Sequence, residues 1–243
     1  LINLPLPQQY GIVIGEEQEP DSPQLVEKLF HVRNAELDRL QNHASSHPDM
    51  SRPFNSYELI CAHLWKHVAQ ARHLEEADNI VRLSVFGDMR FRVNPPLGKA
   101  YFGNGIMFAL ANSTSHQLKS MDLGTIAYMI HNTINDCNEV KMWSKIHWLN
   151  VFGDRIQWEQ SSMMNIVSSP KFKVYGVDFG WGKPVSVRPA SVRRDGELIL
   201  FPSSCGGIDV CMALPQPTME RLLQDVNFLP IYYHSNVCTG ENF

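Results

Sequence analysis

The chain of 243 residues is 44% hydrophobic and carries 21 basic and 25 acidic side chains, a formal net charge of −4. This length and apolar content suffice for a full hydrophobic core and exclude an intrinsically disordered chain. The sequence has no basic block and no apolar run as long as a membrane span, so nucleic acid and membranes are unattractive partners. Five cysteines without a C-x-x-C pair favour reduced thiols in a cytoplasmic protein.

The first part of the chain predicts a linker, a strand and a helix. Residues 1–24 hold four prolines and two glycines, the composition of a linker. The sequence does not begin with Met, and we expect it to be a segment of a longer polypeptide in which residues 25–243 form one domain. A short strand is predicted at 29–32 and a helix at 35–43, with Asn34 as its N-cap.

The best-specified helix runs from Asn55 to about Arg72. Asn55 and Glu58 have the spacing of a capping box, in which each side chain accepts a hydrogen bond from the other residue's backbone N–H. Apolar residues then recur at helical spacing, at Leu59, Ile60, Leu64, Trp65 and Val68.

Alternation, helical spacing and turn residues predict the remaining elements. Strands are expected at 79–86, 101–111, 163–167, 174–177, 185–192, 197–201 and 208–214, and helices at 121–134, 139–152 and 218–225. Trp143 and Trp148 are expected in the core, and Arg194–Gly196 as a hairpin turn. Phe228 is expected to begin a tail. Strands mixed with longer helices predict an α/β domain around a largely β core.

The most distinctive stretch is Asp178-Phe-Gly-Trp-Gly182, which follows the strand predicted at 174–177. Gly180 and Gly182 permit positive φ on either side of Trp181, whose large ring we expect to be buried. The first three letters match the magnesium motif of protein kinases, but the sequence has neither the His-Arg-Asp loop nor the glycine-rich strand that such enzymes need.

The whole pentapeptide, followed by Lys183-Pro184, resembles the DFGWG signature of the plant BAHD acyltransferases. The resemblance extends along nearly the whole chain, since further motifs occur in the order of that family's C-terminal half, at Asn55–Glu58, Gly87–Arg90, Tyr101–Asn104 and Gly206–Gly207. It implies a mixed sheet with flanking helices, the chloramphenicol-acetyltransferase-like C-terminal domain of a two-domain enzyme. Residues 1–24 would then be an interdomain linker.

The resemblance also implies a binding role for two polar stretches. Asn55, Ser56 and Tyr57, at a helix N-terminus with free N–H groups, and Ser168 and Ser169, in the corner before the signature loop, would line the acyl-CoA side of a channel. The alternatives are purely structural: the first stretch caps a core helix, and the second is an ordinary Ser-Pro turn.

A structural role is expected for Asp178, Trp181 and Arg90. A carboxylate at the head of a loop that holds Phe179 and Trp181 is costly to bury alone, so Asp178 needs a cationic partner or several N–H partners. Arg90, or otherwise Arg92 two residues later, is the expected partner in an ion pair. A solvated arginine pair is the alternative.

The sequence holds no complete catalytic set, so no catalytic residue is assigned. Acyl transfer from a thioester needs a general base, which the family carries in an H-x-x-x-D motif of its N-terminal half. None of the ten histidines here has an aspartate four residues later, and no metal-binding pattern is present.

The resemblance therefore implies a monomeric acyltransferase of plant secondary metabolism that is active only with its N-terminal segment. Its co-substrate would be acyl-CoA, no other cofactor would be needed, and the acceptor would be a small-molecule alcohol or amine. A different possibility is a BAHD-like binding or regulatory protein without turnover.

Overall fold

The computed structural model describes most of the chain, namely residues 12–13, 24–44, 47–72, 79–152, 157–158, 160–190, 192, 194–228 and 233–234. Most of the linker predicted at 1–24 and most of the tail lie outside the described residues, as does Cys238.

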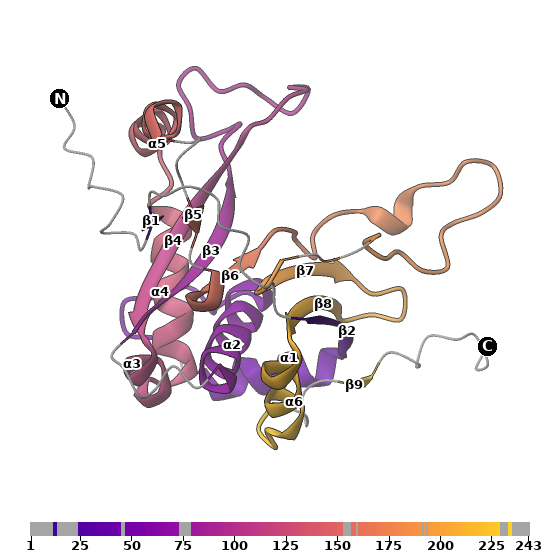
Figure 1. Ribbon diagram of the computed structural model, residues 1–243. Coiled ribbons are helices and arrows are strands. Elements are labelled where there is room, and N and C mark those ends of the chain that lie inside the picture. The colour runs from indigo at the N-terminus through magenta and orange to yellow at the C-terminus, as the bar shows by residue number, and fades with distance from the viewer. Residues whose placement is uncertain are drawn as a thin grey trace.

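One mixed sheet of seven strands organises the described residues, in the order β4-β3-β6-β7-β8-β2-β9 (Figure 1). The central strands β3, β6 and β7 are parallel, and the other neighbours are antiparallel. The strands are β2 (Leu25–Val32), β3 (Ile80–Asp88), β4 (Ile106–Thr114), β6 (Met163–Ile166), β7 (Glu197–Pro202), β8 (Ile208–Pro215) and β9 (Tyr233–His234). A separate antiparallel pair is formed by β1 (Ile12–Val13) and β5 (Gln157–Trp158).

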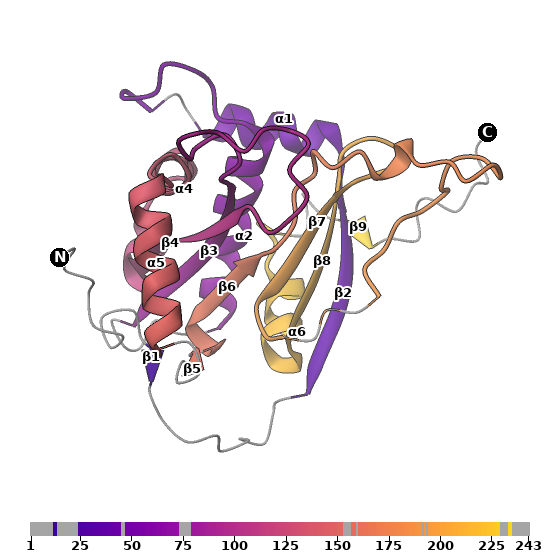
Figure 2. The same cartoon turned by 90° about the horizontal axis from the view of Figure 1, so that it is seen from above.

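The helices cover mainly one face of this sheet. That layer contains α1 (Asn34–His43), α2 (Ser56–Ala71), α3 (Ser115–Ser120), α4 (Leu123–Asn135) and α6 (Gln216–Gln224). In contrast, α5 (Glu139–Phe152) lies on the opposite side near β4, where Lys145 Nζ is 4.0 Å from the centre of the Phe108 ring (Figure 2). The mixed α/β fold with flanking helices is thus confirmed. In the described part of the chain, no helix has the length and apolarity to cross a membrane.

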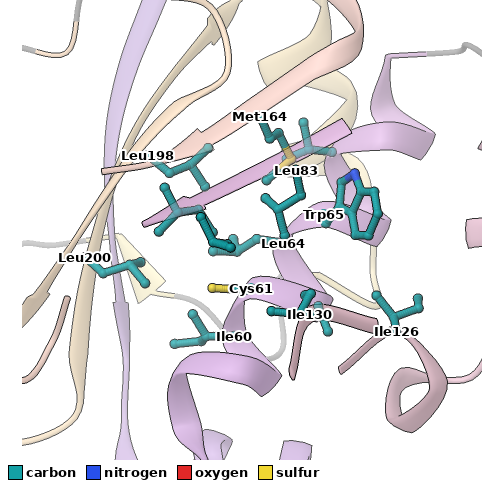
Figure 3. Packing of buried hydrophobic residues seen from close by; sticks show 14 of the residues in the cluster. Ile60, Cys61, Leu64, Trp65, Leu83, Ile126, Ile130, Met164, Leu198 and Leu200 are labelled. Atoms are coloured by element: carbon teal, nitrogen blue, oxygen red, sulfur yellow. The ribbon is translucent and has the colours of Figure 1, made fainter. Parts of the chain in front are cut away.

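The core lies between the sheet and α2, which is buried along nearly its whole length. The capping box predicted at its start is confirmed: Asn55 Oδ1 accepts from the Glu58 N–H (2.9 Å), and Glu58 Oε2 accepts from the Asn55 N–H (2.8 Å). Figure 3 shows Leu64 and Trp65 of this helix beside Leu83 of β3. Each buried side chain of this kind contributes about 1.5–3 kcal/mol to folding.

Strand alternation decides which side chains join this core. On β3, Val81, Leu83 and Val85 are buried against the helices, whereas Ser84 and Phe86 belong to the opposite face. We call this opposite face of the sheet, which the layer of α1, α2, α3, α4 and α6 leaves uncovered, the open face.

Two of the predicted strands are wrong. Residues 174–176 form a 3₁₀ turn (Val174–Gly176), because both edges of β6 are already occupied by β3 and β7. The described residues of the second segment, 185–190 and 192, contain no strand, since Pro184 and Pro189 cannot donate to a ladder. This segment instead attaches to the open face through side chains: Arg188 donates to Asp209 (3.1 Å) and the Val192 N–H to Glu27 (3.2 Å).

Smaller corrections concern boundaries and burial. The N-cap of α1 is Arg33 rather than Asn34, which is already helical. Strand β4 begins at Ile106 rather than at 101, after a glycine-rich loop. Trp148 is in the core as expected (6% exposed), whereas Trp143 is 57% exposed. Phe228, expected to begin a tail, is fully buried against the Phe30 ring, 5.5 Å away.

Two adjacent histidines of α2 pack against Phe228. His63 is 4% exposed, and its ring centre lies 4.2 Å from that of His67 and 5.9 Å from that of Phe228. Burial, together with the neighbouring His67, holds the pKa of His63 well below its ordinary value of 6.5. His63 is therefore neutral in the folded protein at pH values where the unfolded chain binds a proton.

We expect the free energy of unfolding to fall as the pH drops below about 6.5. Below this pH His63 binds a proton in the unfolded chain but stays neutral in the folded protein, which favours unfolding. His63→Gln, which cannot titrate, should reduce this fall, as measured by urea unfolding at a series of pH values. His116→Gln, at an exposed position, is the matched control. An unchanged pH dependence in His63→Gln would contradict the interpretation.

Candidate functional site

The open face carries a hollow at the centre of the sheet. Its volume is about 200 Å³, and it is lined from four strands, by Ser84 and Phe86 of β3, Phe108 of β4, Asn165 and Val167 at β6, and Glu197 of β7. Met163, Arg194 and Asp195 complete the lining, which combines apolar side chains with several polar and charged ones. Small-molecule sites commonly pair apolar surface with convergent polar groups. The hollow lies over the three parallel strands, and its lining includes Met163 and Glu197, the first residues of β6 and β7.

A buried ion pair fixes the turn beside this hollow. Arg72, at the end of α2, lies 2.6 Å from Asp195 (Nη2 to Oδ1) and also donates to the carbonyl oxygens of Ser161 (2.8 Å) and Met163 (2.9 Å). Burial raises the pKa of Asp195 even though Arg72 opposes this shift, and burial lowers the pKa of Arg72. One side chain thus joins α2 to the beginnings of β6 and β7.

Ser168 and Ser169 follow β6 directly beside the hollow. The Val167 N–H donates to the Leu198 carbonyl oxygen (3.0 Å), so strand pairing continues to the residue before Ser168. Both serines are half-buried, and Ser169 Oγ accepts from the Lys171 N–H (3.3 Å). The corner therefore has the Ser-Pro turn geometry that was one alternative, next to a cavity that includes Val167.

Asn55, Ser56 and Tyr57 lie at the N-terminus of α2, and the Asn55 side chain is occupied by the capping box. Ser56 is exposed and Tyr57 is half-buried, and burial raises the pKa of the Tyr57 hydroxyl. The other end of α2 contacts the beginnings of β6 and β7, so its N-terminus points towards the end of the sheet where β6 finishes.

The Glu58 carboxylate ties this N-terminus to its surroundings. Burial alone would raise the pKa of Glu58, but hydrogen bonds from Arg52 and His131 lower it below its ordinary value. Arg52 Nη2 lies 2.9 Å and His131 Nδ1 2.8 Å from Glu58 Oε1. Glu58 therefore connects the cap of α2 to α4.

The loop at 178–182 is held by its own aspartate. Asp178 Oδ1 accepts from the N–H groups of Gly180 (2.7 Å) and Gly182 (3.1 Å), and both glycines have a φ of 98°. The positive φ values predicted for this loop are confirmed. The predicted burial of Trp181 is wrong in this chain, because Trp181 is 93% and Phe179 81% exposed. Figure 1 shows the orange segment that contains the loop projecting away from the sheet.

The ion pair predicted between Asp178 and Arg90 is also wrong. Arg90 pairs with Asp88, two residues before it, at 2.7 Å (Nη2 to Oδ2). Arg92, the second choice, donates to two backbone carbonyl oxygens near the end of α4. Each arginine thus has an acceptor close to it in the chain or the fold. The Asp178 carboxylate instead accepts hydrogen bonds from the backbone N–H groups of the turn that it begins.

Sequence reasoning did not single out the hollow or the Arg72–Asp195 pair. The alternation within β3 places Ser84 and Phe86 on one face and would have been a usable signal. No local pattern joins Arg72 to Asp195, which lie 123 residues apart. Among the described residues, no three His, Cys, Asp or Glu side chains gather as metal ligands would.

The chain is similar to known proteins along most of its length. A family model described as "Transferase family" matches residues 5–229. The chain is 34% identical over 220 residues to the BAHD acyltransferase DCR of Arabidopsis thaliana, covering 86% of this chain and 44% of that protein. It is 26% identical over 201 residues to Hydroxycinnamoyltransferase 1 of Oryza sativa subsp. japonica, covering 79% and 45%.

Solved structures show the same fold. Vinorine synthase matches with a TM-score of 0.68 at 21% identity, covering 89% of this chain and 49% of the synthase chain. F. graminearum TRI101, complexed with coenzyme A and deoxynivalenol, matches with a TM-score of 0.77 at 17% identity, covering 96% and 56%. This chain spans about half the length of the curated relatives that it matches. With the family model matched along most of its residues, the chain belongs to the BAHD acyltransferase family.

Proposed function

We propose that this chain forms the acyl-CoA-side half of an enzyme that transfers an acyl group from a coenzyme A thioester to a hydroxyl or amine of a plant specialised metabolite. Family membership along residues 5–229 is the observation that carries the proposal. The hollow beside Ser168 supports it, because the open face offers a surface on which a second domain and a substrate channel can form.

Acyl transfer requires a general base, and this sequence lacks the histidine motif that carries the base in the family. The acceptor hydroxyl must lose a proton as it attacks the thioester carbonyl, and the resulting oxyanion needs donors. No histidine here begins an H-x-x-x-D motif. We propose that the base belongs to a segment corresponding to the family's N-terminal half, which would close over the open face.

The roles of individual residues follow from this arrangement. Ser168 and Ser169 line the acyl-CoA side beside the hollow, and Asn55, Ser56 and Tyr57 lie towards the same end of the sheet. Asp178 and Arg90 are structural, since each is engaged within its own turn. Trp181, exposed here, is proposed to be covered in the complete enzyme, which we place in the cytoplasm as a monomer.

A binding or regulatory protein without turnover is the second candidate, favoured by the missing histidine motif.

We expect no acyltransferase activity from the 243-residue chain alone. Activity should appear when an N-terminal segment containing H-x-x-x-D is added, with release of free coenzyme A thiol as the measurement.

The matched control is the same segment with its motif histidine changed to alanine. Turnover by the isolated chain would contradict the placement of the base. Binding of acyl-CoA without turnover in the combined protein would favour the second candidate.

Ser168→Ala should raise the KM for acyl-CoA or lower kcat severalfold in the combined protein, while the unfolding midpoint changes little. The reason is that Ser168 adjoins the hollow and is not part of the buried core. Ser120→Ala, on α3, is the control and should change neither constant. If Ser168→Ala behaves like this control, the corner is only a turn.

Asp178→Asn should change the free energy of unfolding of this chain by no more than about 0.5 kcal/mol, as expected for an exposed turn residue. Asp195→Asn should cost about 3–5 kcal/mol, because it strands the buried Arg72 guanidinium. Urea unfolding of both variants measures the contrast. A loss at Asp178 as large as that at Asp195 would restore the hypothesis of a buried partner for Asp178.

A further inference from the structure

A cysteine, a histidine and an aspartate lie in line at the turn between β7 and β8. His31 of β2 and Asp209 of β8 are direct partners across the two strands. Cys205 Sγ lies 3.6 Å from His31 Nε2, and His31 Nδ1 lies 2.7 Å from Asp209 Oδ1. A nucleophile, a base and a group that orients the base thus occur in the order that activates a thiol.

Hydrogen bonding fixes the direction in which a proton can move. An ionised carboxylate only accepts hydrogen bonds, so His31 Nδ1 carries the proton that it shares with Asp209. The Nε2 lone pair then faces the Cys205 thiol. Arg188 Nη1 donates to Asp209 Oδ2 at 3.1 Å, so both carboxylate oxygens are held. His31 and Asp209 are each 5% exposed, which keeps the pair in one geometry.

The thiol itself is open to reagents. Cys205 is exposed, whereas Cys61, Cys137 and Cys211 are buried. The Ser203 hydroxyl lies 3.3 Å from Cys205 Sγ and adds a second polar contact. An accessible thiol beside a positioned histidine is the environment in which cysteines react selectively.

We propose that Cys205 is a modification site that forms mixed disulfides with low-molecular-weight disulfides of the glutathione class. His31 Nε2 takes the proton of the thiol, and the thiolate attacks one sulfur of the disulfide. A new S–S bond forms as the old one breaks, and the leaving thiolate receives the proton from His31. Cys205 is oxidised and one half of the small disulfide is reduced to a thiol, so no further oxidant is needed.

A disulfide suits this site better than a thioester does. Attack on a thioester creates an oxyanion that needs hydrogen-bond donors. In this turn the N–H groups of Gly206 and Ser203 are already used, by the carbonyl oxygens of Ser203 and Gly207. Attack on a disulfide creates no oxyanion. The proposal is therefore independent of acyl transfer.

Oxidised glutathione is the probe, with peptide mapping by mass spectrometry to locate the adduct in the 243-residue chain. Near neutral pH, Cys205 in the folded chain should react about tenfold faster than the same cysteine in urea-unfolded chain, because only folding brings His31 to it. The buried cysteines should react more slowly when folded. An equal or lower rate for folded Cys205, or an adduct that forms on another cysteine instead, would overturn the proposal.

Variants test whether His31 activates Cys205 as a base or whether exposure of the thiol alone explains its reactivity. Cys205→Ser should lose the adduct, and His31→Gln should slow its formation about tenfold, while His116→Gln should leave the rate unchanged. If His31→Gln is as fast as the unchanged chain, His31 is not the base and the assignment fails. Should His31→Gln not fold, the comparison of folded and unfolded chain decides alone.

Discussion

The ion pair between Arg72 and Asp195 is the constraint on which the arrangement of the sheet depends. A guanidinium and a carboxylate are removed from water at the point where the helix layer, β6 and β7 meet, and Arg72 also satisfies two carbonyl oxygens there. Such a pair adds little net stability compared with apolar packing, but it penalises any arrangement that separates its members. The position of the hollow on the open face follows from this fixed junction.

The parts predictable from sequence were those specified by neighbouring residues. The capping box of Asn55 and Glu58, the apolar spacing of α2 and the positive φ of Gly180 and Gly182 each depend on a few consecutive positions. The strand expected at 174–177 failed because strand formation needs a free neighbouring edge, which no local pattern reveals. The strand expected at 185–192 failed because Pro184 and Pro189 cannot donate to a ladder.

The same limit applies to the partners of charged side chains. Asp178 was assigned a distant arginine on the assumption that its loop is buried, yet the carboxylate is satisfied by its own turn. Family resemblance predicted a binding role for the two serines that lie beside the hollow, but it did not predict the groups that shape the hollow. The Cys205, His31 and Asp209 cluster joins residues from two distant parts of the sequence, and only the pairing of β2 with β8 shows it.

That pairing also governs the order in which the molecule can form. Leu25–Val32 leaves the ribosome long before its partner Ile208–Pro215, because most of the sequence of this domain lies between them. Until then β2 has hydrogen-bonding groups without its main neighbour and a row of apolar side chains without a core. Contacts between distant parts of a chain form slowly and leave such edges open to association. Nascent chains that stop before β8 are therefore expected to need chaperone protection.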